Sequence, residues 1–287
     1  YDPASKAMAN RNTTYLGIVG FLNAYLLTGD DRYLDVWRRQ VDAVNANKKV
    51  VDGQTLYPRM FGDKGWYDFS PQKYEQGLPE IAYLSQKPED FARLPQSGWR
   101  AWLAGGNAGY PEAVLRGDLE RLRQRVQGMR NDPTTPDTRL SDDPMAFNPA
   151  SVQSLIELML GGIHPGHRGA VLHSALRYFD PDQRRPGIPE DVAALVSALD
   201  GERVTVTLVN VNQLASRRVI LQAGAYAEHR FTSVTLAGNT TSLDSPRVEV
   251  TLSPGSGATL AFTHRRHVNV PTMALPWDVD REPGSAP

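Results

Sequence analysis

The chain has 287 residues, of which 40% are apolar and 22% charged, a balance typical of a globular protein with room for two domains. Its formal net charge of -1 and its lack of any apolar run of roughly 18 residues predict no nucleic-acid partner and no membrane span. It contains no cysteine, which excludes disulfides, thiolate metal sites and a cysteine nucleophile.

The sequence starts at Tyr1, within helix-like sequence, so we expect a processed or truncated piece of a longer protein. Its composition is compatible with the cytoplasm and with the periplasm. We expect a soluble protein, with periplasm or secretion slightly favoured, and the compartment stays open.

Two helices are predicted at the start of the chain, over residues 3–28 and 32–47. Gly29 stands where a glycine ends a helix, and Asp30 or Asp31 can cap the next one. So short a turn predicts an antiparallel helical hairpin. The second helix carries one apolar stripe, made of Leu34, Trp37, Val41 and Val44.

This hairpin has the sequence LNAYLLTGDDRYLDVWRRQVDAV. It resembles the helix pairs of (α/α)-toroid proteins, the helical barrels common among glycoside hydrolases and polysaccharide lyases, in which a TGD..YL turn often joins an inner and an outer helix. The resemblance covers one hairpin. It implies a toroid-like helical domain and a carbohydrate substrate.

Residues 48–72 alternate glycine, proline and aromatic residues without a helical period. We expect a long ordered loop, and such loops are often functional. A sugar-binding cleft needs aromatic rings that stack on the sugar and charged groups that bind its hydroxyls. The candidates for substrate binding are Tyr57, Arg59, Trp66 and Tyr67, with Asp63 as a candidate acid or base. The alternative is that the aromatic rings fill gaps between helices.

Further helices are predicted over 73–85, 88–93, 97–104, 111–130 and 149–160. Pro79 lies inside the first of these spans, so that helix kinks or starts late. The helix at 111–130 has one apolar stripe, and we expect its arginine-rich opposite face to be solvated. The stripe consists of Leu115, Leu119, Leu122, Val126 and Met129.

The loop before the last of these helices carries Asp137, Asp142 and Asp143 together with Arg139. Two carboxyls in different environments can act as general acid and general base, as in glycosidases. Arg139 can clamp a substrate carboxylate with two hydrogen bonds. The alternative is that these aspartates cap turns.

Three histidines follow within ten residues, His164, His167 and His173. They offer a general base near neutral pH, and His164 is the candidate that we carry forward. Their spacing matches no named metal motif and the chain has no HExxH, so we expect no metal and no cofactor. A structural role for all three stays open.

After Gly162 the period changes from helical to two. Strands are predicted over 169–179, 191–199, 202–211, 216–223, 226–236, 246–252 and 257–264. Turn signals recur about every ten residues, which is typical of an antiparallel β-sandwich. The segments VTVTLVNVN, RRVILQAGAY and VEVTLSPGSGATLAF also resemble the sandwich domains that follow catalytic barrels in many carbohydrate-active enzymes.

The predicted architecture is therefore α+β with two domains. Residues 1–162 form a helical (α/α)-hairpin domain, toroid-like and either complete or partial, and residues 163–270 form an antiparallel β-sandwich. Residues 271–287 form an extended tail that Trp277 docks onto the body.

The two resemblances imply a glycoside hydrolase acting on a poly- or oligosaccharide, with Asp63 and either Asp142 or Asp143 as acid and base. One alternative is a polysaccharide lyase, in which Arg139 neutralises a uronate, a histidine is the base and Tyr67 is the acid. Another is a non-catalytic sugar-binding or assembly module. About six helices make half of a twelve-helix toroid, so a missing part of the same protein or another chain is an expected partner.

Overall fold

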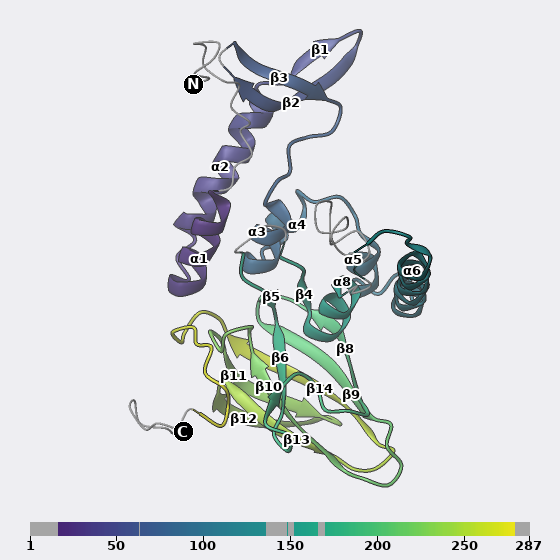
Figure 1. The fold of residues 1–287 in the computed structure, drawn as a ribbon. Coiled ribbons are helices and arrows are strands. Elements are labelled where there is room, and N and C mark those ends of the chain that lie inside the picture. Colours follow the sequence, from purple (N-terminus) through teal and green to yellow (C-terminus); the bar gives the residue numbers. More distant parts are fainter. Residues whose placement is uncertain (1–16, 63, 136–147, 149–151, 166–169, 279–287) are drawn as a thin grey trace. The chain divides into compact units, whose positions relative to one another are not determined.

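The computed structural model describes residues 17–62, 64–135, 148, 152–165 and 170–278 (Figure 1). It mixes helices with antiparallel sheets. Within these residues no helix has both the length and the apolar character of a membrane span. Seven α-helices lie in the part of the chain that is described, and they do not make up a closed toroid.

The chain divides into two compact units with discontinuous bounds. The first comprises Tyr1–Pro95, Pro165–His173 and Arg266–Pro271, and the second comprises Gln96–His164, Ser174–Arg265 and Thr272–Pro287. These bounds differ from the predicted domains, 1–162 and 163–270, because the segment after Pro95 belongs with the strands that follow it.

The first unit begins with the hairpin of α1 (Ile18–Thr28) and α2 (Arg32–Ala46). As predicted, Gly29 ends α1, with a φ of 66°, and its N–H donates to the Tyr25 carbonyl at 2.7 Å. At the start of α2 it is the Asp30 carboxylate that accepts from the Arg32 N–H, at 3.0 Å. The hairpin turn therefore satisfies the backbone groups that both helix ends leave open.

The core of the first unit joins this hairpin to α3 (Leu78–Ser85), which α4 (Pro88–Phe91) follows. The predicted stripe of α2 is buried in this core. Helix α3 starts late, after Gly77, whose φ is 80°, which is one of the two outcomes predicted from Pro79. The buried cluster consists of Ile18, Leu22, Tyr25, Leu34, Trp37, Val41, Val44, Tyr74, Leu78, Ile81 and Leu84.

The C-terminal end of α3 is held by a residue from far along the chain. The Arg266 guanidinium donates to the carbonyls of Leu84 and Ser85. A cation at this end of a helix is favourable because the last carbonyls carry a partial negative charge. The His267 ring also packs edge-on against Tyr25, with the centroids 4.7 Å apart.

The prediction of a loop over 48–72 is wrong, because the segment forms an antiparallel sheet in the order β1-β2-β3. Its strands are β1 (Lys49–Val51), β2 (Gln54–Gly62) and β3 (Gly65–Ser70). Asp52 and Gly53 form the tight turn between β1 and β2, with φ of 50° and 78°. Asp-Gly is a strong hairpin signal, since both residues tolerate positive φ.

The helices of the second unit match their predicted positions. They are α5 (Gly98–Leu103), α6 (Tyr110–Asn131), α8 (Gln153–Leu155) and the π-helix η1 (Ile156–Leu160). The Ser97 hydroxyl caps α5 by accepting from the Arg100 N–H. Gly161, with a φ of 61°, ends η1 where the sequence predicts a stop.

The second unit is built mainly of two antiparallel sheets. The first has the order β13-β10-β6-β7, with β6 (Leu176–Asp180), β7 (Arg185–Pro186), β10 (Arg217–Ala223) and β13 (Arg247–Leu252). The second has the order β12-β11-β14-β9-β8, with β8 (Val192–Leu199), β9 (Arg203–Asn210), β11 (Arg230–Leu236), β12 (Asn239–Ser245) and β14 (Gly257–Arg265). Two further strands are short, β4 (Gly162–Ile163) and β5 (His173–Ser174).

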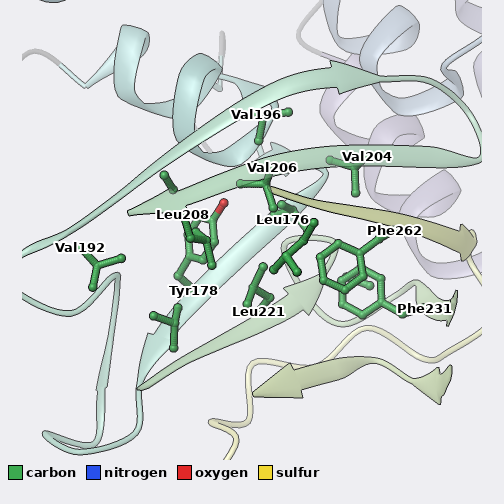
Figure 2. Packing of buried hydrophobic residues seen from close by; sticks show 14 of the residues in the cluster. Leu176, Tyr178, Val192, Val196, Val204, Val206, Leu208, Leu221, Phe231 and Phe262 are labelled. Carbon is green, nitrogen blue, oxygen red and sulfur yellow. The ribbon is translucent and has the colours of Figure 1, made fainter. Parts of the chain in front are cut away.

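Both sheets contribute to one hydrophobic cluster (Figure 2), as a sandwich requires. Alternate residues of β9, Val204, Val206 and Leu208, are fully buried in it. Phe231 and Phe262 pack against each other within the cluster with tilted rings, whose centroids are 4.4 Å apart. The tail is docked as predicted, since Trp277 packs edge-on against Phe179.

Candidate functional site

The first unit contains an open cavity of about 470 Å³ on its β-sheet. Strands β2 and β3 form one wall, and the segment that leads into α3 forms the other. The cavity is lined by Arg59, Met60, Asp68, Ser70, Tyr74, Glu75 and Gln76. Three of these residues are charged and exposed, so the cavity presents charge to solvent.

The first wall is formed where the β2–β3 ladder is irregular. Pro58 pairs with Phe69 and Met60 with Tyr67, so Arg59 and Asp68 occupy the position between these pairs. Asp68 has a φ of 54°, outside the range of an extended strand, and the regular pairing skips it. Aspartate tolerates this conformation better than most residues do.

The charged groups of the cavity are not neutralised by each other. Arg59 donates one hydrogen bond, from Nη2 to the Ser70 hydroxyl at 3.1 Å. Within the described residues neither Arg59, Asp68 nor Glu75 forms an ion pair. One cation and two carboxylates therefore remain available to a ligand.

The second wall is fixed to helix α2 at both ends. The Asn45 side chain bonds both backbone groups of Tyr74, accepting from its N–H at 2.8 Å and donating to its carbonyl at 2.9 Å. The Trp37 indole donates to the Gln76 carbonyl at 2.9 Å, and the Tyr74 hydroxyl to the Gln76 side chain at 2.7 Å. Glu75 is thus held between two anchored residues, which is how a preorganised site is built.

Of the four predicted substrate-binding residues in this sheet, Arg59 alone lines the cavity. Trp66 packs against the core of the first unit and meets Phe61 edge-on at 4.9 Å. Tyr57 and Tyr67 are half-buried on β2 and β3. The Trp66 ring therefore fills space in the core, which is the alternative to sugar binding that the sequence left open.

The predicted catalytic residues are described only in part. Asp63, Asp142 and Asp143 lie outside the described residues, as do Asp137, Arg139 and His167. His164 is described and is exposed after β4, in the second unit.

His173 is buried, with 3% of its surface exposed, and within the described residues neither ring nitrogen has a hydrogen-bond partner. Burial lowers its pKa to about 4, because the protonated ring would lose its hydration. His173 is therefore neutral at physiological pH, and it is a buried residue of the first unit. No group of three or more potential metal ligands occurs in the parts of the chain that are described.

A second charged cluster in the first unit is structural. Asp90 is 2% exposed and receives two hydrogen bonds from Arg38, at 2.8 and 2.5 Å. Arg38 and Lys87 also bind Asp31, at 2.9 and 2.7 Å. Partial burial on its own would raise the pKa of Asp31, but the hydrogen bonds from these two cations outweigh it and hold that pKa below the ordinary range. The cluster joins α2 to α4.

The second unit holds a buried polar turn between β10 and β11. The Glu228 carboxylate accepts from the backbone N–H groups of Ala225 and Tyr226, at 3.3 and 2.7 Å. The rings of His229 and His264 stack beside it, with centroids 5.7 Å apart. Glu228 thus closes its own turn, which accounts for its burial without a ligand.

Sequence reasoning missed Asp68, Tyr74, Glu75 and Gln76 as lining residues. The Asp-Gly turn at Asp52 was the available signal, because it predicts the hairpin from which the first wall is built. Comparison of the chain with protein-family models, curated proteins and solved structures gave no match. The cavity and its charges are the observations from which a function can be inferred.

Proposed function

We propose that the chain is part of a carbohydrate-active protein of the glycoside hydrolase type and that the cavity between β2–β3 and Glu75 is its sugar-binding site. The supporting observation is a rigid cavity in which Arg59, Asp68 and Glu75 are exposed and form no ion pair among the described residues. Its volume of about 470 Å³ falls within the range of small-molecule sites.

The residue types suit a ligand rich in hydroxyl groups. Carboxylates such as Asp68 and Glu75 accept hydrogen bonds from hydroxyls, and a guanidinium donates them to ring and hydroxyl oxygens. Hydrolysis of a glycosidic bond needs one carboxyl that donates a proton and one that acts as base or nucleophile. Asp68 and Glu75 join Asp63, Asp142 and Asp143 as candidates for these roles.

The α1–α2 hairpin supports the same proposal through its resemblance to the helix pairs of (α/α)-toroid enzymes. In this proposal the helices of the first unit are part of a toroid that further helices complete. The two sheets of the second unit then correspond to the sandwich that follows the catalytic barrel in such enzymes.

A uronic acid substrate is the second candidate, and the Arg59 guanidinium favours it. The part of the chain that the structure describes offers this guanidinium no carboxylate partner. A guanidinium can bind a substrate carboxylate with two hydrogen bonds. Neutralising that carboxylate is the first requirement of a lyase, and a non-catalytic module would use the same contact for binding alone.

The test compares variants of the cavity with variants outside it. Binding of neutral and uronic oligosaccharides would be measured by calorimetry, and turnover by release of reducing ends and by the ultraviolet absorbance of unsaturated products. Asp68→Asn and Glu75→Gln should lower turnover by roughly 100-fold or more if they act as acid and base. Arg59→Ala should weaken the binding of uronic sugars more than that of neutral ones.

The sheet offers a matched control, Asp52→Asn, because Asp52 is also exposed and also has a positive φ of 50°. Glu89→Gln on α4 is the control for Glu75, and Lys64→Ala for Arg59. Sugar binding without turnover in the unaltered chain would favour the non-catalytic module. Unchanged binding and turnover in all three cavity variants would remove the cavity from the function.

A further inference from the structure

Helix α6 exposes its apolar stripe. It is 22 residues long and buries none of its side chains. Leu119 is 53% exposed, Met129 46%, Leu122 40% and Leu115 37%, and Val126 is half-buried. The stripe of Leu115, Leu119, Leu122, Val126 and Met129 is therefore largely open to solvent, and we refer to it as the leucine stripe.

Such a helix is poorly supported by the contacts that it makes. Most helical stability in proteins comes from packing of an apolar face. Near its start α6 is held by the Tyr110 hydroxyl, which donates to Glu157 at 2.7 Å. Farther along, Arg125 donates to the Asn148 carbonyl at 2.8 Å. Both contacts hold α6, and neither involves a residue of the leucine stripe.

The spacing of the leucine stripe is that of a coiled-coil seam. Its members follow each other at intervals of four, three, four and three residues. Two heptads of this kind present a narrow seam about 21 Å long, at about 1.5 Å per residue. A seam this narrow fits one facing helix.

Three arginines lie beside the leucine stripe at the same period. Arg116, Arg123 and Arg130 each follow a stripe residue directly and are seven residues apart. This arginine row is exposed. Its contacts with Glu112 at 2.7 Å and Glu120 at 3.9 Å are exposed pairs within the helix, which are weak and can yield to a stronger partner.

We propose that the leucine stripe and the arginine row form a docking surface for an amphipathic helix of another protein, one that carries acidic residues beside its own apolar seam. Charges that flank the seam choose the partner in coiled coils. A second copy of this chain fits less well, because an antiparallel pair of α6 helices would bring two arginine rows together. A membrane surface also fits less well, since membrane-bound helices present a broad apolar face rather than a narrow seam.

The test uses the full chain and two synthetic peptides. Both are three-heptad helices with leucine at the seam positions, and their flanking positions are all glutamate in one and all lysine in the other. Fluorescence anisotropy should show at least tenfold tighter binding of the glutamate peptide. The paired change Leu119→Gln and Leu122→Gln should weaken that binding at least tenfold. Changing Gln124→Ala and Gln127→Ala, on the polar side of α6, is the matched control and should leave it unchanged.

A charge-reversed chain keeps every apolar residue and tests the arginine row alone. With Arg116→Glu, Arg123→Glu and Arg130→Glu, the preference should reverse in favour of the lysine peptide. Equal affinity for the two peptides, or no binding of either, would overturn the proposal. Two other results would also overturn it. One is that the chain binds neither peptide but associates with itself, and the two leucine changes abolish this self-association. The other is that it binds neither peptide but binds phosphatidylserine vesicles, and the two leucine changes abolish that binding.

Discussion

Each of the two units of this protein is stabilised internally by a different kind of contact. The sandwich core consists of apolar side chains from two sheets that close on each other (Figure 2). The first unit has a smaller apolar cluster and adds the buried ionic contacts between Arg38 and Asp90. Apolar burial involves no protonation, whereas a buried ion pair requires both of its groups to be charged. We therefore expect the units to respond differently to the same kind of change.

The largest effect is expected in the sandwich. Phe262→Ala should lower the free energy of unfolding of the second unit by about 3–5 kcal/mol, because it leaves a cavity beside Phe231 in a fully buried site. Denaturant unfolding followed by tryptophan fluorescence and circular dichroism would measure it. Leu214→Ala, at a side chain that is 93% exposed, is the control and should change the same free energy by less than about 0.5 kcal/mol. Similar losses in both variants would contradict the apolar account of this core.

In the first unit the corresponding change is Asp90→Ala. It leaves the Arg38 guanidinium, whose side chain is only 13% exposed, without its buried carboxylate, and should cost about 3 kcal/mol. Asp35→Ala removes an exposed partner of the same arginine and should cost less than about 1 kcal/mol. Equal costs would mean that burial does not distinguish the two contacts.

The first unit should also lose stability in mild acid, because the pKa of His173 is about 4 in the folded chain and about 6.5 when unfolded. Between these values the unfolded state binds the proton more readily, so stability falls as the pH decreases. The loss should reach about 2 kcal/mol at pH 5, from 1.5 pH units at about 1.36 kcal/mol each. Unfolding curves between pH 8 and pH 5 would measure it, with the sandwich as the internal reference. His173→Phe should remove this pH dependence, and an unchanged slope would assign it to another group.

The smallest effect is expected on α6. Leu119→Gln should change the free energy of unfolding of the chain by less than about 0.5 kcal/mol, because the side chain is already 53% exposed. Its melting temperature should therefore hardly change. Differential scanning calorimetry would measure it. A loss comparable to that of Phe262→Ala would show that the leucine stripe is covered within the chain in solution.

The same contrast explains which parts of the fold could be predicted. The strands of the sandwich alternate buried and exposed residues, as in β9, and the period of two locates them. Strand β12 was missed because it lies at the edge of its sheet and Leu243 is its only apolar residue. Strands β1 to β3 were missed because Pro58 and three glycines interrupt the alternation.

The sequence predicts the segment in which the candidate site lies, but it identifies few of the residues that line the site. Arg59 was identified from its residue type among aromatics. Asp68 and Glu75 were not, because what brings them to one cavity is the register of β2 with β3 and the bonds from Asn45 to Tyr74. The bond from Asn45 to Tyr74 joins positions 29 residues apart, and a local pattern of apolar and polar residues carries no information about such a contact.

The contact of Arg266 with the end of α3 has a consequence for how the chain is made. The first unit is assembled from three separate stretches, the last of which, Arg266–Pro271, follows the whole sandwich. During synthesis this contact can form only after the sandwich strands, the last of which ends at Arg265, have been made. Those strands can pair before it forms. No single proteolytic cut can release the first unit intact, so limited digestion should yield a stable sandwich fragment without a stable N-terminal counterpart.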